Sequence, residues 1–289
     1  MATGKEIKAR IKSVKNTGKI TKAMELISTV KMKKSQELAV HARPFAIEAA
    51  KILGQIDPAT FGVSHTRGKD LILVIASNKG LCGGYNVNVF KEIVAATGGK
   101  EAEFELVTAG KRARDFIGRT GNVLKADFSE NLKDTITIRD AKTISRFLQD
   151  AYKSGEYTRV RVIYSHFVSA ISQRPTLKTL FPISHSDMSE FLASLGVTVS
   201  SGKTPEIEPS PKALAETTLP MIYDLMVYEA LLEAKASEHA ARMVAMKNAK
   251  DSANKKVKGL TLTFNKARQA SITKEVSEIV SGVESMKDA

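Results

Sequence analysis

The longest helical pattern in the sequence runs from Lys212 to about Met286, and it constrains the fold more than any other feature. Only Pro220 and Gly259 interrupt the pattern before Gly282, which lies near its end. At 1.5 Å per residue, about 75 residues would extend over roughly 110 Å. A helix of that length cannot be covered by a domain of ordinary size. Its apolar side therefore needs a partner of comparable length.

The first 57 residues supply that partner. Thr3 and Glu6 have the spacing of a capping box at the start of a helix, and apolar residues follow in steps of mostly three and four. So narrow a stripe is typical of a coiled-coil seam. We expect a shift of its phase near Gly18 and a bend at Pro44. The stripe comprises Ile7, Ile11, Val14, Ile20, Met24, Ile27, Leu38, Ala42, Phe45, Ala49, Ile52 and Ile56.

The C-terminal pattern carries a matching stripe, which polar residues interrupt. Its apolar members are Leu214, Met221, Leu225, Tyr228 and Leu232, then Val257, Leu260, Phe264 and Ala267, and finally Ile272, Val276, Ile279, Val283 and Met286. After the first group, Lys235, His239 and Arg242 occupy the stripe positions. These three residues either face solvent where the helix pair splays, or form a collar that contacts a partner. Their spacing leaves both interpretations open.

Strand-like and helix-like segments alternate in the middle of the chain. The expected strands are residues 71–77, 103–108, 159–167 and 176–182, and the expected helices are 87–96, 111–118 and 140–154. This alternation is typical of an α/β domain with a largely parallel sheet.

The predicted fold class is therefore α/β plus a long antiparallel α-helical coiled coil. The N-terminal helix (1–57) and the C-terminal helix (212–287) pair with each other. A Rossmann-like α/β domain (70–195) and a linker (196–211) rich in Gly, Ser and Pro are inserted between them.

Two glycine-containing segments invite comparison with nucleotide-binding motifs, and neither fits. Gly80, Gly83 and Gly84 follow an expected strand, but they lack the G-x-G-x-x-G spacing of a dinucleotide site. The segment 202–204 reads Gly-Lys-Thr, but the preceding Gly196 lies one residue too far away for a phosphate-binding loop. Pro205 follows it directly, so no helix can begin there.

The sequence contains no constellation of residues that predicts catalysis. Its five histidines are scattered, and Cys82 is its single cysteine, with a small buried thiol as the default interpretation. No pair of carboxylates stands out as a general acid and base. We therefore predict no catalytic, cofactor-binding or metal site, and a mechanical or binding role.

The net charge of +13 is concentrated at the N-terminus. Residues 1–57 hold 12 Lys and Arg against 5 Asp and Glu, whereas residues 211–289 hold 12 against 10. An acidic partner is implied, which could be nucleic acid, anionic lipid or an acidic protein surface. No apolar stretch approaches the roughly 18 residues of a membrane span, so direct membrane insertion is not expected. A rotor shaft, a nucleotide-binding enzyme and a basic nucleic-acid binder are the three classes to compare.

Several segments resemble the gamma subunit of F-type ATP synthases of the bacterial type. They are the opening helix (5–36), SNKGLCGGYN (77–86), FVSAISQRPT (167–176), SEHAARMVAMKNAKDSA (237–253) and LTLTFNKARQASITKEVSEIVSGVES (260–285). The last segment is the most specific, because chance agreement at so many polar positions is negligible. The resemblance covers nearly the whole chain.

The resemblance implies a rotating central stalk without a catalytic site or cofactor. Its expected partners are the alpha and beta subunits (an alpha3beta3 ring), the epsilon subunit and the c-ring, and no nucleic acid. The stalk would couple proton-driven rotation of the membrane ring to the conformational cycle of the beta subunits. Its expected location is peripheral, at the cytoplasmic face of the bacterial inner membrane.

The resemblance also carries individual residues onto this sequence. Residues expected to contact a beta subunit, or to support the coiled coil beside it, are Met24, Arg242, Gln269, Thr273, Glu275 and Glu278. Ile272, Val276, Ile279 and Val283 are expected to belong to the seam instead. Lys31, Lys33 and Lys34 are either a solvated face or a partner contact.

Overall fold

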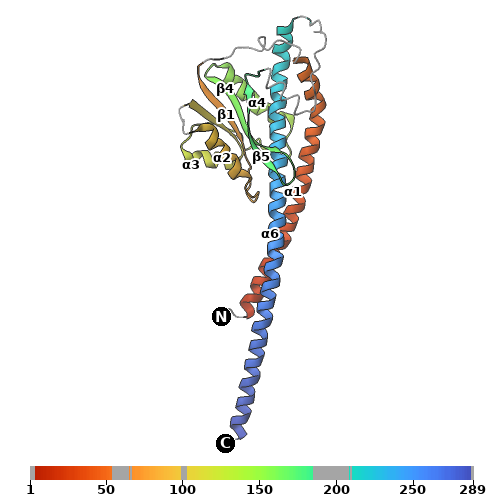
Figure 1. Ribbon diagram of the computed structural model, residues 1–289, viewed down its shortest axis with the longest axis vertical. Helices are drawn as coiled ribbons and strands as arrows, with labels where there is room; N and C mark the ends of the chain where they lie inside the picture. The colour runs from red at the N-terminus through yellow and green to blue at the C-terminus, as the bar shows by residue number, and fades with distance from the viewer. Residues whose placement is uncertain are drawn as a thin grey trace. The chain divides into compact units, whose positions relative to one another are not determined.

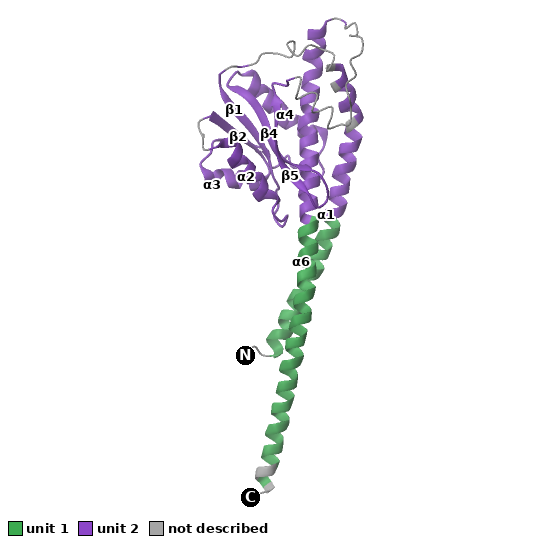
Figure 2. Cartoon of the chain, viewed as in Figure 1, with its two compact units in different colours: residues 1–27, 243–289 green, residues 28–242 purple. Residues whose placement is uncertain are grey.

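The computed structural model describes residues 4–53, 65, 67–98, 103–184, 208 and 210–287 (Figure 1). The chain divides into two compact units. Unit 1 comprises residues 1–27 and 243–289, and unit 2 comprises residues 28–242 (Figure 2). Helix α1 (Gly4–Leu53) and helix α6 (Pro211–Lys287) each contribute to both units. Of the predicted domain boundaries at 57, 70, 195 and 211, those at 57 and 195 lie outside the described residues, and the predicted division into domains stays a prediction.

Unit 2 is built on a five-stranded sheet with the order β3-β2-β1-β4-β5. The strands are β1 (Lys69–Ile75), β2 (Phe104–Ala109), β3 (Leu124–Asp127), β4 (Tyr157–Phe167) and β5 (Gln173–Phe181). The first four run parallel, and β5 pairs antiparallel with β4. The predicted Rossmann-like, largely parallel sheet is confirmed. Strand β3 was not predicted, because four mostly exposed residues at a sheet edge show no periodic pattern.

Helices cover both faces of the sheet. On one face lie α2 (Tyr85–Thr97) and α3 (Lys111–Thr120), whose Val89, Ile93, Ala113 and Ile117 pack on Ile72, Val74, Leu106 and Ile163. On the other face lie α4 (Ile138–Lys153) and the first half of α6. Successive side chains of β1 and β4 point to opposite faces of the sheet, so they pack alternately into the core on one face and the core on the other.

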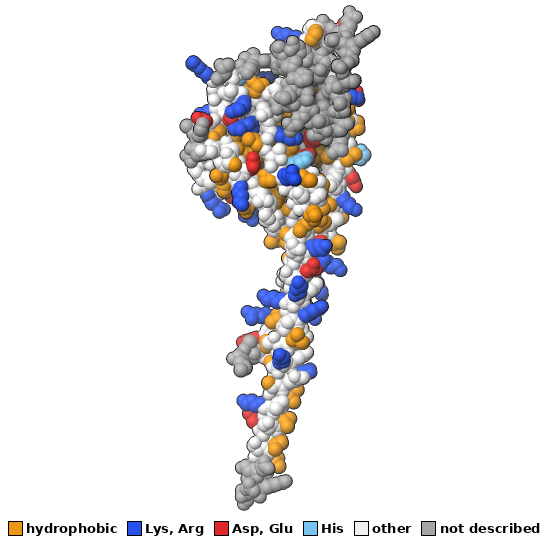
Figure 3. All heavy atoms as spheres, in the orientation of Figure 1, with side chains coloured by type: hydrophobic (Ala, Val, Ile, Leu, Met, Phe, Trp, Pro, Cys, Tyr) orange, Lys and Arg blue, Asp and Glu red, His pale blue; other side chains and the backbone are white. Residues whose placement is uncertain are grey.

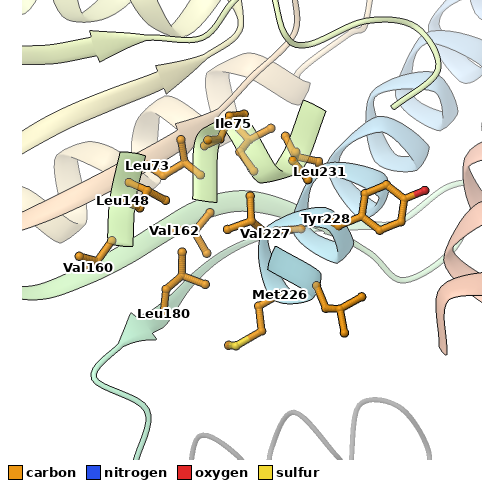
Figure 4. Close-up of a cluster of buried hydrophobic side chains, with 14 of the residues drawn as sticks. Leu73, Ile75, Leu148, Val160, Val162, Leu180, Met226, Val227, Tyr228 and Leu231 are labelled. Carbon is orange, nitrogen blue, oxygen red and sulfur yellow. The ribbon is translucent and has the colours of Figure 1, made fainter. Parts of the chain in front are cut away.

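The first half of α6 is part of the α/β domain, because its side chains pack in the core of that domain. Figure 4 shows Val227 and Leu231 of α6 in one cluster with Leu73 and Ile75 of β1 and Leu148 of α4. The segment from residue 222 to 240 is buried at almost every position. A helix buried all round belongs to a domain core. Ala46 and Ala49 of α1 belong to the same cluster, so this part of α6 packs on the sheet and on α1 together.

The antiparallel pairing of the chain ends is confirmed within unit 1. A methyl group at Gly4 would lie 3.8 Å from the Phe264 ring, and one at Gly18 would lie 3.5 Å from the Ala253 side chain. Lys250 Nζ donates a hydrogen bond to Glu25 at 2.8 Å. As the residue number rises along α1, its partner on α6 falls, which defines antiparallel helices.

The predicted phase shift near Gly18 is wrong. Other positions of α1, Met24 and Leu38 among them, are partly covered, but one regular series of covered positions runs through the helix. In unit 1 it comprises Ile7, Ile11, Val14, Gly18, Thr21 and Glu25, and in unit 2 it comprises Ser28, Met32, Ser35, Ala39, Ala42, Ala46 and Ala49. The steps alternate between four and three throughout, as in an uninterrupted heptad repeat. The apolar residues Ile20 and Ile27 had suggested the shift, but their side chains are 61% and 54% exposed. Small or short polar residues occupy many seam positions from Gly18 onwards, namely Gly18, Thr21, Ser28, Ser35, Ala39, Ala42, Ala46 and Ala49.

Several other expected seam residues are also exposed. Phe45, Ile52 and Met221 are exposed in unit 2, and Ile272, Val276, Ile279, Val283 and Met286 are exposed in unit 1. For this last group the reason is length. Gly4, at the beginning of the described chain, already lies beside Phe264, so no described residue of α1 remains to cover α6 beyond Ala267. The assignment of Ile272, Val276, Ile279 and Val283 to the seam is therefore wrong.

Some predictions fall on residues that the structure does not describe. They are the Thr3 cap, Ile56, the Gly-Lys-Thr segment at 202–204 and most of the linker. Within the described chain, none of the helices combines the length and the hydropathy that crossing a membrane requires.

Candidate partner-binding surface

The end of α6 beyond Ala267 is exposed on every side up to Val283. Five apolar residues follow one another there in steps of four and three, namely Ile272, Val276, Ile279, Val283 and Met286. At about 100° per residue, they form one stripe along the helix. Orange side chains mark this stripe in the lower part of Figure 3. We call it the terminal stripe.

Polar residues from the sequence prediction border the terminal stripe. At about 100° per residue, Gln269 and Thr273 lie on one side of it, and Glu275 and Glu278 lie on the other. All four side chains are exposed. Ser271 Oγ donates a hydrogen bond to Glu275 at 3.1 Å, and Lys274 Nζ lies 3.5 Å from Glu278. An apolar stripe with polar borders on an uncovered helix has the character of a helix that binds in an apolar groove or ring.

Met24 lies in a different part of unit 1. Its side chain is half-buried, next to the seam residue Glu25. Since Glu25 pairs with Lys250, Met24 lies at the level of about residue 251. This level is about 18 residues, or roughly 27 Å along the helix, from Gln269. The structure therefore brings four of the six predicted residues together on one segment, and Met24 stands apart from them.

Arg242 lies in unit 2, inside a buried polar cluster. Its Nη2 lies 2.8 Å from Glu238 Oε1, and Glu238 Oε2 accepts a hydrogen bond from Lys235 Nζ at 3.1 Å. Arg242 Nη1 also lies 3.2 Å from His239 Nδ1. All four side chains are buried. The interpretation that Lys235, His239 and Arg242 face solvent is therefore wrong.

Charge and burial set the protonation states in this cluster. Burial would raise the pKa of Glu238, but the charges of Lys235 and Arg242 outweigh it, and the pKa of Glu238 is lowered. Burial lowers the pKa of His239 to about 4; the Glu238 carboxylate opposes this shift, and the cations Lys235 and Arg242 add to it. His239 is therefore neutral at pH 7, and its Nδ1 accepts a hydrogen bond from Arg242 Nη1.

The Gly-rich turn between β1 and α2 faces this cluster with acceptors. Arg242 Nη2 donates to the Lys79 carbonyl at 3.1 Å, and Arg242 Nε donates to the Gly80 carbonyl at 3.3 Å. A phosphate group needs donors, so this arrangement favours the structural interpretation of the turn over a nucleotide site. Cys82 is buried in the same turn, with Asn86 Nδ2 3.2 Å from its sulfur. Among the described residues, no cluster of His, Cys, Asp and Glu could hold a metal ion.

The sequence analysis missed Glu238, the anion on which the cluster depends. The signal was present, because Lys235 and Arg242 lie three residues before and four residues after Glu238, and such neighbours meet on one helix face. The contribution of the Gly-rich turn could not be found in this way, since it lies about 160 residues away in the chain. Lys31, for which two interpretations were open, pairs with Asp134 at 2.7 Å.

Comparison with known proteins places the whole chain in one family. The family model described as ATP synthase matches residues 3–286. The ATP synthase gamma chain of Heliobacterium modesticaldum is 37% identical, over 96% of this chain and 97% of the relative. The gamma chain of Methylacidiphilum infernorum is also 37% identical, with the same coverage of both chains. The chain belongs to the ATP synthase gamma-chain family.

Solved structures of the family share this fold. A chain of the central stalk and c-ring structure of the Tetrahymena thermophila mitochondrial ATP synthase matches with a TM-score of 0.60 and 25% identity. The match covers 80% of this chain and 99% of that one. A rotor chain of the Euglena gracilis mitochondrial ATP synthase matches with a TM-score of 0.66 and 18% identity, over 93% and 98% of the two chains. As a gamma-family member, the chain is a non-catalytic subunit.

Replacing His239 by asparagine is expected to reduce the loss of folding stability that this gamma-family chain undergoes as the pH falls. Below pH 6.5 the unfolded histidine takes up a proton, whereas the folded one stays neutral down to about pH 4. The folded state therefore loses stability as the pH falls through this window, by about 3 kcal/mol at most for pKa values that differ by about 2.5. Asparagine can still accept from Arg242 but cannot titrate. Urea unfolding midpoints measured from pH 7 to 4 would show a smaller decline.

His41→Asn is the control for this experiment, because His41 is exposed on α1. It should leave the decline unchanged. Equal declines in the His239 variant and the unaltered chain would contradict the neutral, buried assignment of His239.

Proposed function

We propose that this chain is the rotating central stalk of a bacterial F-type ATP synthase, with the end of α6 inserted into the ring of alpha and beta subunits. The observation that carries the proposal is the terminal stripe, an apolar surface that no described residue of the chain covers. Exposed apolar surface of this length is unfavourable in water and is typical of a binding site. The relatives named above are gamma chains, and the solved chains that resemble this fold come from the central stalk and the rotor of ATP synthases.

The helix can change the conformation of its partners because its sides carry different kinds of side chain. Rotation would turn the apolar stripe, then one polar border, then the other, towards each beta subunit in succession. Contacts that differ between an open and a closed beta subunit shift the equilibrium between these two states. A nearly complete shift requires about 5.5 kcal/mol of differential interaction. Gln269, Thr273, Glu275 and Glu278 are the proposed polar contacts in this region, and Met24 is a further proposed contact nearer to unit 2.

The remaining partners follow from the same proposal. The α/β domain would bind the epsilon subunit and the c-ring, and the chain would couple proton-driven rotation of that ring to ATP synthesis. The stalk would lie peripherally at the cytoplasmic face of the bacterial inner membrane. Its basic N-terminal segment would face acidic protein surfaces rather than nucleic acid.

Replacing Val276 by aspartate tests the role of the terminal stripe. Burying a carboxylate in an apolar partner surface costs several kcal/mol. The ATP hydrolysis rate of the reconstituted alpha–beta–gamma complex should therefore fall at least about tenfold. Helix content and urea unfolding of the isolated chain should not change, because the residue is exposed within it.

The matched control is Ser281→Asp. Ser281 is exposed on the same segment, but it lies about 180° from Val276's stripe by helical geometry. This variant should retain most of the activity. If the two aspartates had equal effects, or if neither had any, the stripe would not be the surface that enters the ring.

A further inference from the structure

We propose that Arg242 is a positioning residue that clamps the Gly-rich turn of the α/β domain to α6, so that the domain and the helix turn as one body. The proposal rests on the function proposed above. It concerns how torque passes from the domain, which would contact the c-ring, into the helix that would enter the alpha–beta ring. Arg242 suits this role because α6 continues from it without a break into unit 1.

The guanidinium group of Arg242 uses all three of its nitrogens. Two of them donate to successive backbone carbonyls, those of Lys79 and Gly80, at 3.1 and 3.3 Å. The group also binds Glu238 at 2.8 Å and His239 at 3.2 Å, both on α6 itself. The side chain is only 9% exposed. It therefore joins one turn of α6 to two adjacent peptide groups of the domain and leaves almost no surface for another protein.

The Gly-rich turn is in turn fixed to the rest of the domain. Asn78, which directly precedes Lys79 in the turn, donates from Nδ2 to the carbonyls of Ser129 and Leu132 at 3.0 and 2.8 Å. Its Oδ1 accepts from the amide of Lys111, at the start of α3, at 2.9 Å. A force applied to the domain is therefore transmitted to the carbonyls that Arg242 holds.

The first residue of α2, directly after the turn, makes a second directional contact with α6. Tyr85 OH donates to the carbonyl of Ala234 at 3.2 Å. This hydroxyl is buried, and burial raises its pKa well above the ordinary value, so it remains a donor. The turn and the start of α2 thus contact α6 at Arg242 and at Ala234, two turns of helix apart, which resists both sliding and rotation of α6.

These polar contacts add a directional restraint, which the apolar core cannot supply. The core between α6 and the sheet consists of aliphatic contacts, which are strong in sum but have no direction. Hydrogen bonds from a rigid guanidinium fork require a defined distance and angle. A helix that carries torque needs this directional restraint in addition to its core.

Clamping and partner contact predict different results for Arg242→Lys. Lysine keeps the positive charge and can keep the ion pair with Glu238, but it is a point donor and cannot hold two carbonyls as a fork. Contact with an acidic partner surface depends on charge and would survive the change. The clamp would be lost, because it depends on the two hydrogen bonds that the guanidinium fork makes.

The test uses the complete, membrane-bound complex with Arg242→Lys and with Asn78→Ala, which loosens the same turn from its other side. Hydrogen exchange of the amides at 79–86 should accelerate about tenfold in both variants. The number of protons pumped per ATP hydrolysed, measured against an opposing proton gradient, should fall by about half or more. Arg146→Lys, an exposed arginine on α4, is the control and should change neither quantity.

Two outcomes would overturn the clamp. In one, Arg242→Lys behaves like the unaltered complex while Arg242→Ala loses pumping, which would indicate a charge contact with a partner. In the other, exchange accelerates but the pumping ratio does not change, which would indicate a purely structural role. Failure of the proposed function is a separate result, since it would appear in the Val276→Asp experiment with Arg242 intact.

Discussion

Glu238→Gln is expected to lower the free energy of unfolding of the chain by about 3–5 kcal/mol. The carboxylate is 5% exposed and is the shared counter-ion of two buried cations, Lys235 at 3.1 Å and Arg242 at 2.8 Å. Removing it takes the nearest negative partner from both cations in a medium of low dielectric constant, and losing one member of a buried pair typically costs this much. Glutamine has nearly the same shape, so the loss reports charge rather than packing.

The measurement is urea unfolding of the full chain at pH 7, followed by circular dichroism. The control is Glu48→Gln, which removes an exposed ion pair with Lys51 on α1. It should cost no more than about 0.5 kcal/mol, because surface pairs contribute little. A loss in the Glu238 variant as small as that in the control would mean that water, and not Glu238, stabilises the two cations.

Gly110→Ala is expected to have an effect of similar size for a different reason. Gly110 has a φ of +125°, and a methyl group there would lie 2.1 Å from the carbonyl oxygen of Ala76. That oxygen belongs to the backbone at the end of β1, where the Ala76 amide also bonds to the Ala109 carbonyl at 3.0 Å. Relief of the clash would require the ends of two central strands to separate. A loss of about 3 kcal/mol or more in unfolding free energy is therefore expected.

Gly121→Ala is the matched control, since Gly121 also has a positive φ, of +75°, but no atom of the described residues lies within 4 Å of the added methyl group. It should cost only the backbone strain of about 1–2 kcal/mol. Comparing the two unfolding free energies separates strain from collision. Equal losses in the two variants would show that the ends of the two central strands can separate without lowering the free energy of unfolding.

The positions of most helices and strands could be predicted because the responsible signals are local. The apolar run Leu71–Ala76 predicts a buried strand, and the alternation of strands and helices predicts a parallel sheet. The edge strand β3 could not be predicted, because its formation depends on pairing with β2 and not on its own composition.

The candidate site was predictable only in part. The exposed polar residues Gln269, Thr273, Glu275 and Glu278 came from the resemblance to the family, and their contacts with a partner stay a prediction. The terminal stripe was visible in the sequence, but it was assigned to the seam. A periodic apolar stripe does not reveal what covers it, and here the decisive fact is where α1 begins relative to α6.

By itself, the sequence determined that two long helices flank an α/β domain and pair in opposite directions. Helix periodicity and length are properties of each segment, so they can be read along the chain. Tertiary structure alone decided that Thr21 and Ser28 lie in the seam while Ile20 and Ile27 do not, and that Arg242 is buried against a turn about 160 residues away. The physical reason is that burial depends on which surfaces meet. Residue type sets only the free energy that a side chain gains or loses once they do.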